Sequence, residues 1–334
     1  MENNYVFFIE GFKGLDILFF LDIQNKENVK IITRRNIFRS NILKFIFILH
    51  FSHKISKIIK LPLKNLWYSK IFKNTFRNNN RLYFIFSPGW YYPKYVEYLK
   101  KMYKDAKFII YFSDTIESKI KNIPTINIKS IKKDFDLILS YNPEDVKKYD
   151  LKFSSIYYSK LTTKMQSSLP KYEEVDILFI GAAKNRLEII EKLYDKFIEL
   201  GLKCFFYVVV DKNFHQKKNQ KGIIFSKKMM PFNEYLARIF STKHILEVLD
   251  PNTSGCTLRF WEAVMYNKKL ISNFKYLKNS KFYSKDKMLY FENLEDIKEK
   301  FFLNKKNVHY NYQNENSPIN FLKKIDELLQ SQNN

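Results

Sequence analysis

One stretch, residues 245–273, restricts the fold of this chain more than its composition does. It begins with a short apolar run, Ile245 to Leu249, that suits a strand buried in a parallel sheet. Turn residues follow from Asp250 to Gly255, and a helical pattern of apolar residues begins at Thr257. A second apolar strand runs from Leu270 to Ser272. The stretch therefore predicts a strand–turn–helix–strand unit, and the N-terminus of its helix is suited to bind an anion.

Two charged residues lie near the start of this predicted helix. Arg259 and Glu262 are three positions apart, so both project from one side of the helix. A guanidinium beside the positive helix end suits a diphosphate, and a carboxylate one turn later suits the hydroxyls of a ribose or a sugar. An ordinary surface pair is the competing interpretation. The preceding Gly255 and the flanking strands favour a nucleotide-sugar site.

The run S-G-C-T-L-R-F-W-E-A-V-M-Y-N-K-K-L-I-S-N resembles a motif of bacterial GT-B glycosyltransferases encoded in capsule and lipopolysaccharide clusters. Their donor-binding pattern is G-L-T-x-R-x-x-E-A-L-x-x-x-K-K-L-I-T-x-N. The residues that fit it are Gly255, Thr257, Arg259, Glu262, Lys268, Lys269 and Asn273. Cys256 stands where Leu is usual, and Ser272 stands where Thr is usual. In the related E-x7-E motif of many retaining enzymes, Glu262 fits the second glutamate, whereas Ser254 occupies the position of the first.

The resemblance implies an α/β protein of the GT-B class, with two doubly wound Rossmann-like domains facing a cleft. It extends to F-I-G-A-A-K-N-R in the second half of the chain, which would open the donor domain. The donor-binding residues it implies are Gly181, Lys184, Arg186, Ser254, Gly255, Cys256, Thr257, Arg259 and Glu262. The expected activity is transfer of a sugar from a nucleotide sugar to a glycan or lipid-linked acceptor during surface polysaccharide or lipooligosaccharide synthesis.

The length of 334 residues and the order of the patterns suggest two domains. We expect an acceptor-side domain at 1–160, a linker at 161–174, a donor domain at 175–316 and a terminal helix at 317–334. In the resembled fold such a helix commonly packs back on the N-terminal domain. The predicted strands are 5–9, 29–33, 82–87, 108–112, 135–140, 154–158, 175–180, 204–210, 223–225, 245–249, 270–272 and 288–291. The predicted helices are 15–21, 91–103, 187–200, 233–240, 257–265, 295–302 and 319–329.

An inverting enzyme of this class needs a general base on the acceptor side. Asp114, at the end of a predicted strand, and Glu10, beside the first turn, are the candidate catalytic residues along with Glu262. Each of the first two also fits a structural turn or cap carboxylate. Asp134-Phe135-Asp136 spells a metal-binding D-x-D but precedes a strand, so we interpret it as structural, as we do His244. We expect no metal, because no D-x-D stands at a strand end to hold one, and no cofactor, because the nucleotide sugar is a substrate.

The excess of 58 basic over 34 acidic residues gives a formal charge of +24, which attracts polyanions. No zinc-finger or RNP-type motif accompanies it, so nucleic acid is not the expected partner. Residues 34–81 combine Lys and Arg with many Ile, Phe and Leu. Two interpretations are open for this segment: ordinary surface helices of the first domain, or a basic amphipathic surface that contacts an anionic membrane.

Two cysteines, Cys204 and Cys256, lack the spacing of a disulfide framework or a zinc site, which fits a reducing cytoplasm. The opening M-E-N-N lacks the basic region of a signal peptide. We therefore expect a cytoplasmic protein, with peripheral contact to the inner face of the membrane as the open alternative. The competing function is a non-catalytic basic α/β protein that binds membrane or nucleic acid and carries a vestigial nucleotide pocket.

Overall fold

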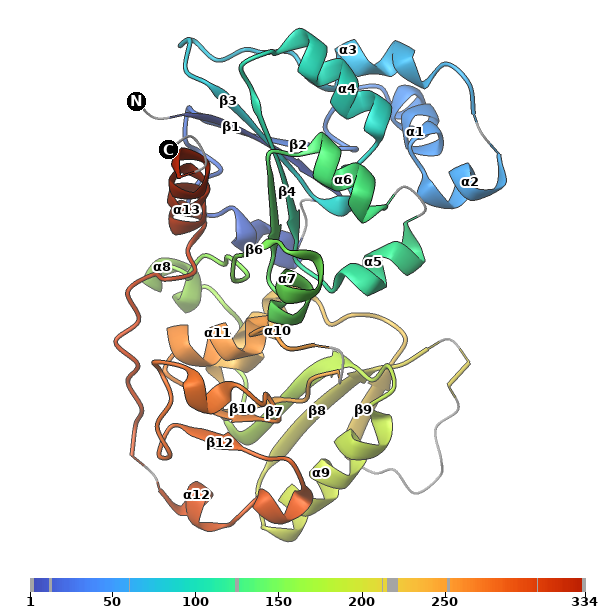
Figure 1. Ribbon diagram of the computed structural model, residues 1–334. Coiled ribbons are helices and arrows are strands. Elements are labelled where there is room, and N and C mark those ends of the chain that lie inside the picture. Colours follow the sequence, from blue (N-terminus) through green and yellow to red (C-terminus); the bar gives the residue numbers. More distant parts are fainter. Residues whose placement is uncertain are drawn as a thin grey trace. The chain divides into compact units, whose positions relative to one another are not determined.

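The computed structural model describes residues 3–11, 14–59, 61–123, 126–211, 213–214, 222–250, 253–304 and 306–331 (Figure 1). Two compact units make up the chain. The first unit comprises 1–159 together with 316–334, and the second comprises 160–315. Residues 12–13 of the turn beside Glu10, residues 251–252 of the turn before Thr257, and residues 217–221, whose charged sequence predicts a loop, lie outside the described residues.

The first unit is built on a six-stranded sheet in which all paired strands run parallel. Its order is β2-β1-β3-β4-β5-β6, so the direction of winding reverses between β1 and β3. The strands are β1 (Asn4–Ile9), β2 (Val29–Thr33), β3 (Leu82–Phe86), β4 (Lys107–Phe112), β5 (Leu137–Ser140) and β6 (Lys152–Phe153).

Both faces of this sheet are buried, which explains why its strands are apolar without alternation. Val6 and Phe8 of β1 enter the core on one face, and Tyr5, Phe7 and Ile9 enter the core on the other. The helical elements of the unit are η1 (Gly14–Phe19), α1 (Asn41–His50), α2 (His53–Ile58), η2 (Lys64–Trp67), α3 (Tyr68–Ile71), η3 (Pro88–Trp90), α4 (Pro93–Met102), α5 (Ile116–Asn122), α6 (Ile128–Asp134), α7 (Pro143–Tyr149) and α13 (Pro318–Gln330).

The helix expected at 319–329 is α13, and it packs against the sheet of the first unit beside β1 (Figure 1). The hydroxyl of Tyr5 donates a hydrogen bond to Asp326 Oδ2 at 2.6 Å. The ring of Phe321 stacks on Tyr157 with centroids 4.2 Å apart. Residues from both ends of the described sequence thus complete one core.

The second unit has an equivalent parallel sheet of order β12-β11-β10-β7-β8-β9. Here the winding reverses between β7 and β10. The strands are β7 (Val175–Ala182), β8 (Cys204–Val209), β9 (Ile223–Ser226), β10 (Thr242–Glu247), β11 (Lys269–Ser272) and β12 (Met288–Tyr290). The helical elements are α8 (Thr163–Ser167), α9 (Leu187–Glu199), α10 (Phe232–Phe240), α11 (Leu258–Met265), η4 (Leu277–Asn279), η5 (Leu294–Asp296) and α12 (Lys300–Leu303).

The predicted α/β class with two doubly wound parallel sheets is confirmed, and a few element boundaries are corrected. The strand expected at 154–158 is irregular, because pairing with β5 ends at Phe153. The helix expected at 295–302 is split into η5 and α12. The segment expected to be a linker, 161–174, contains α8, capped by Thr162, and belongs to the second unit. Across the residues that the structure describes, every helix is too short or too polar to span a bilayer.

Candidate functional site

The carboxyl ends of β7 and β10 lie side by side where the winding of the second sheet reverses. These strands pair in parallel, with Ile245 opposite Leu178. In open α/β sheets ligands bind at such a reversal, outside the carboxyl ends of the strands. The turn after β7 and the turn after β10 contribute the residues that the sequence singled out, so the fold brings the two predicted motifs together.

Arg259 lies in the first turn of α11 and reaches back to the end of β7. Its Nη2 donates a hydrogen bond to the carbonyl oxygen of Ile180. A Cβ atom at Gly181 would lie 3.0 Å from the same Nη2. The absence of a side chain at Gly181 therefore leaves room for the guanidinium over the strand end.

Arg186 brings a second guanidinium to this place. It is the N-cap residue of α9, and it donates to the carbonyl oxygens of Ala182, at 2.6 Å, and Val248. Burial, followed by repulsion from Arg259, lowers the pKa of Arg186, while Asp250 and Glu247 act in the opposite direction. Two mutually repelling cations at the strand ends favour binding of an anionic group. Lys184, in the same turn, is exposed and has a φ of 46°.

Glu247, the last residue of β10, is a buried carboxylate that the sequence analysis missed. It accepts hydrogen bonds from Thr257 Oγ1 and, at 2.5 Å, from Ser272 Oγ. The backbone N–H of Phe260, in the first turn of α11, also binds it. Burial raises the pKa of this carboxyl, and the two hydroxyl hydrogen bonds and the charge of Arg259 oppose that rise. One of the free N–H groups at the start of α11 is therefore satisfied by the protein itself.

The turn that leads into α11 is partly buried. Ser254 and Gly255 are buried, and Thr257 is the N-cap, with its Oγ1 accepting from the N–H of Arg259 at 3.2 Å. Cys256 is half-buried, and burial raises the pKa of its thiol to about 12. The thiol is thus a neutral group at physiological pH.

Glu262, which the resemblance assigns to sugar hydroxyls, is fully buried in α11. The hydroxyl of Tyr235, on α10, lies 2.8 Å from its Oε1 and 2.7 Å from its Oε2. Burial, together with the adjacent Glu262 carboxylate, raises the pKa of Tyr235 well above its usual range. The phenol of Tyr235 is therefore protonated and donates its hydrogen bond to the carboxylate of Glu262.

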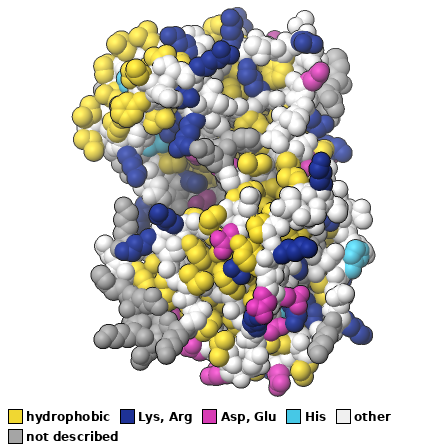
Figure 2. All heavy atoms as spheres, turned by 180° about the vertical axis from the view of Figure 1, so that it is seen from behind, with side chains coloured by type: hydrophobic (Ala, Val, Ile, Leu, Met, Phe, Trp, Pro, Cys, Tyr) yellow, Lys and Arg dark blue, Asp and Glu magenta, His cyan; other side chains and the backbone are white. Residues whose placement is uncertain are grey.

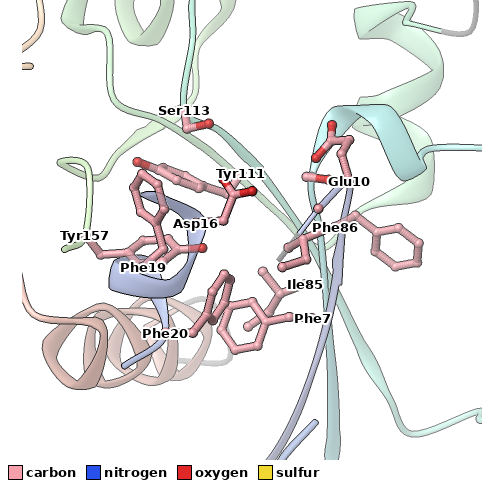
Figure 3. Close-up of a pocket in the computed structure, with 13 residues that line it drawn as sticks. Phe7, Glu10, Asp16, Phe19, Phe20, Ile85, Phe86, Tyr111, Ser113 and Tyr157 are labelled. Atoms are coloured by element: carbon pink, nitrogen blue, oxygen red, sulfur yellow. The ribbon is translucent and has the colours of Figure 1, made fainter. Parts of the chain in front are cut away.

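The first unit has a cavity of about 170 Å³ at its own reversal point, between β1 and β3 (Figure 3). Glu10, Asp16 and Ser113 supply polar groups to it, and Tyr111 and Tyr157 are among its aromatic walls. Glu10 is fixed by the backbone N–H of Gly89, which donates to its Oε1 at 2.9 Å. Of the two predicted general-base candidates, Glu10 is the one that lines this cavity.

Asp114 has a different environment from Glu10. Its Oδ1 accepts from the N–H of Thr115 at 2.9 Å, and its Oδ2 lies 3.7 Å from Lys119 Nζ. The neighbouring Ser113, and not Asp114, lines the cavity. Those contacts are typical of a carboxylate that stabilises the start of a helix.

The residues interpreted as structural have structural contacts. Asp134 accepts from the hydroxyl of Tyr91 at 2.6 Å, and Asp136 accepts from the N–H of Phe108 at 2.7 Å. His244 is buried, its Nδ1 lies 2.8 Å from the carbonyl oxygen of Asp176, and burial lowers its pKa to about 4. Within the described residues, no three His, Cys, Asp or Glu side chains gather as metal ligands would.

Solved structures that align with both units share little sequence with this chain. An alpha-glucosyltransferase in complex with UDP-glucose and DNA containing an abasic site is 12% identical, with 98% of this chain and 99% of that chain covered at a TM-score of 0.59. The trehalose-6-phosphate synthase OtsA is 9% identical, with 98% and 99% covered at a TM-score of 0.57. A UDP-forming trehalose-phosphate synthase from Burkholderia xenovorans is 9% identical over 98% and 99%, with a TM-score of 0.53.

No protein-family model and no curated protein sequence matches the chain. At these identities the likeness identifies the fold. Because it covers nearly the whole chain and both sheets, the protein has the GT-B fold, as the sequence motifs indicated.

Proposed function

We propose that the protein is a glycosyltransferase that uses a nucleotide-sugar donor. The observation that carries the proposal is the pair of guanidinium groups, Arg259 and Arg186, at the winding reversal of the second sheet, beside a glycine that makes room for one of them. A nucleoside diphosphate is a ligand whose charge matches these groups. Three fold neighbours are described with UDP-glucose, UDP or UDP-2-fluoro glucose bound, which supports the same ligand class for this chain.

In the proposed reaction, an acceptor hydroxyl forms a bond to the anomeric carbon while the bond from that carbon to the phosphate oxygen breaks. Negative charge develops on the leaving nucleoside diphosphate. Arg259 and Arg186, with Lys184 in the same turn, would stabilise that charge, and fixed charges of this kind commonly supply the largest catalytic contribution. Because these cations can neutralise the leaving group, we propose that transfer needs no metal ion.

The proton of the acceptor hydroxyl requires a base if the reaction inverts the anomeric centre. We propose Glu10 for this role, because it lines a cavity whose aromatic walls suit the faces of a sugar. The backbone N–H of Gly89 holds one of its oxygens, which leaves the other available for a proton. Asp114 is the second candidate, with its carboxylate already bound to Thr115 and Lys119.

We further propose that the acceptor is a glycan or a lipid-linked glycan of surface polysaccharide or lipooligosaccharide synthesis, reached from the cytoplasmic side of an anionic membrane. Two features support this part: the resemblance of residues 254–273 to enzymes of capsule and lipopolysaccharide clusters, and the basic apolar segment at 34–81.

A non-catalytic basic protein with a vestigial pocket is the second candidate. Two observations favour it: Ser254 stands where retaining relatives have a glutamate, and Glu262 is engaged by Tyr235. The two candidates differ in one property that can be measured directly, which is tight binding of an intact nucleotide sugar.

Donor-dependent thermal stabilisation tests the proposal. The melting temperature should rise with one member of a panel of UDP-, GDP-, dTDP- and CMP-sugars, because a ligand that binds only the folded state stabilises it. Arg259→Ala should abolish that rise. The matched control is Arg238→Ala, which removes an arginine packed 3.8 Å from the ring centroid of Tyr172 and 3.9 Å from that of Phe205. The control should lower the melting temperature while keeping the donor-dependent rise.

The outcomes separate the candidates. A rise in melting temperature with one donor that is lost in Arg259→Ala and kept in Arg238→Ala supports the donor site. No rise with any donor at millimolar concentration favours the vestigial pocket. A rise that survives Arg259→Ala shows that the donor binds elsewhere.

A further inference from the structure

Large apolar side chains are exposed over one short stretch of the first unit. Nine of the eighteen large apolar residues exposed in the described part of the chain fall within residues 42–66. They are Ile42, Leu43, Phe45, Ile46, Ile48, Ile58, Ile59, Leu63 and Leu66. We call these nine residues the α1–α2 surface. Exposed apolar side chains this concentrated in one stretch mark an interaction surface.

The local packing explains why these side chains face outward. In α1, Phe47 is the fully buried residue, and it holds the helix to the core through Phe51, with ring centroids 4.6 Å apart, and Trp67, at 5.7 Å. Ile42, Phe45 and Ile46 have the i, i+3, i+4 spacing of one helix face and are 72%, 61% and 37% exposed. The helix is thus anchored on one side and apolar on the other.

The charge around this surface has a single sign. Residues 34–81 contain twelve Lys and Arg, and no Asp or Glu occurs from 28 to 96. Arg35, Arg39 and Lys54 flank the apolar residues in sequence and are exposed. Figure 2 shows side chains of the hydrophobic class gathered over the region of α1 and α2, with Lys and Arg at its margin.

We propose that the α1–α2 surface inserts into the interfacial region of a bilayer that contains anionic lipids. An apolar helix face bordered by basic side chains suits this environment, because the acyl chains receive the apolar groups and the anionic headgroups receive the cations. A second copy of the chain is a poorer occupant, since a two-fold interface would bring the same basic residues face to face.

This membrane contact rests on the proposed function for its biological role, because a membrane-docked glycosyltransferase would meet lipid-linked acceptors at the bilayer surface. Binding to vesicles needs neither donor nor acceptor, however. Failure of vesicle binding would therefore leave the donor-dependent thermal shift intact, and failure of the donor shift would leave vesicle binding intact.

Flotation of the whole protein with two vesicle preparations provides the test. One preparation is phosphatidylcholine alone, and the other contains about 30% phosphatidylglycerol. We expect flotation with the anionic vesicles at least tenfold above that with the neutral ones, and a decrease between about 0.1 M and 1 M salt. The triple variant Ile42→Ser/Phe45→Ser/Ile46→Ser should float with the anionic vesicles at least tenfold less than the unmodified protein does.

Matched controls come from the second unit. Ile198→Ser/Leu303→Ser removes apolar residues that are 47% and 66% exposed outside the α1–α2 surface, and it should bind vesicles as the unmodified protein does. Phe45→Trp should report insertion as a blue shift of emission with anionic vesicles, whereas Leu303→Trp should show none.

Three results would overturn the proposal. One is no flotation with anionic vesicles at low salt. Another is flotation that the triple variant retains in full, which would indicate adsorption through the overall positive charge. The last is a dimer in solution that the triple variant dissociates, which would show that a second copy occupies the surface.

Discussion

Gly181 and Arg259 share one small volume: a Cβ atom on Gly181 would lie 3.0 Å from Nη2 of Arg259. A methyl group there requires the guanidinium to shift by a few tenths of an ångström, which disturbs its hydrogen bond to the carbonyl oxygen of Ile180. Gly181→Ala should therefore weaken donor binding by about tenfold, roughly the value of one charge-assisted hydrogen bond. Isothermal titration with the donor found in the panel measures this change.

Gly201→Ala is the matched control for that variant. Gly201 has a φ of 71°. Apart from its chain neighbours, no atom of the described residues lies within 4 Å of the position that a Cβ would take, so alanine costs about 1 kcal/mol of backbone strain without touching the site. It should lower stability and keep donor affinity. Equal loss of donor affinity in both variants would contradict the role given to Gly181.

Glu247→Gln should change the pH dependence of stability. Burial raises the pKa of this carboxyl above its ordinary value of 4.5, so the folded state holds the proton more tightly than the unfolded state. The carboxyl group therefore makes its full contribution to the free energy of unfolding below pH 4.5. That contribution is lost as the pH rises through the pKa of the group in the folded state. Urea unfolding measured from pH 4.5 upward should show that the free energy of unfolding of the variant rises relative to that of the unmodified protein.

The control for the loss of one carboxylate is Glu295→Gln, at an exposed position. A stability difference between Glu247→Gln and the unmodified protein that stays constant with pH would show that Glu247 does not titrate in this range.

His244 should destabilise the fold in acid. Burial lowers its pKa from 6.5 to about 4, so the folded state keeps the ring neutral. The contribution of the neutral ring to the free energy of unfolding is present in full above pH 6.5 and is lost as the pH falls toward 4. At 1.36 kcal/mol for each pKa unit, the loss reaches about 3 kcal/mol. His244→Gln should flatten this part of the profile, whereas His309→Gln, at an exposed position, should not.

Glu10→Gln should lower the transfer rate by about 10²- to 10⁴-fold, the usual contribution of a general base. The donor-dependent thermal shift should persist, since the donor residues are in the other unit. Asp114→Asn should retain most activity, because that carboxylate is engaged by Thr115 and Lys119. Initial rates measured across pH test this assignment. If Asp114→Asn loses more activity than Glu10→Gln, Asp114 is the general base.

Transfer should continue in excess EDTA and should not be stimulated by Mg²⁺ or Mn²⁺. The physical reason is that Arg259 and Arg186 supply the positive charge that a metal would otherwise bring to the leaving diphosphate. Loss of activity in EDTA, restored by a divalent cation, would show that the guanidinium groups are insufficient.

Sequence patterns predicted the two sheets well, because strands buried on both faces appear as unbroken apolar runs between turn residues. They also placed Gly181 and Arg186 in the turn after one strand, and Arg259 near the start of the helix that follows another strand. The parallel topology then brings these residues together. Glu247 was missed because it lies inside the apolar run 245–249, where only its pairing with Thr257 and Ser272 reveals a role. Sequence spacing could not show that Tyr235 binds Glu262, because the two residues are 27 positions apart and lie on different helices.

The packing of α13 against β1 has a consequence for synthesis of the chain. The second unit is one continuous stretch, 160–315, whereas the first unit needs residues on both sides of it. As the ribosome proceeds, the second unit can close its core while the sheet of the first still lacks Phe321 and Ile325. The half that is translated first is thus completed last, and until then its uncovered sheet face is the part of the nascent protein most exposed to misassembly.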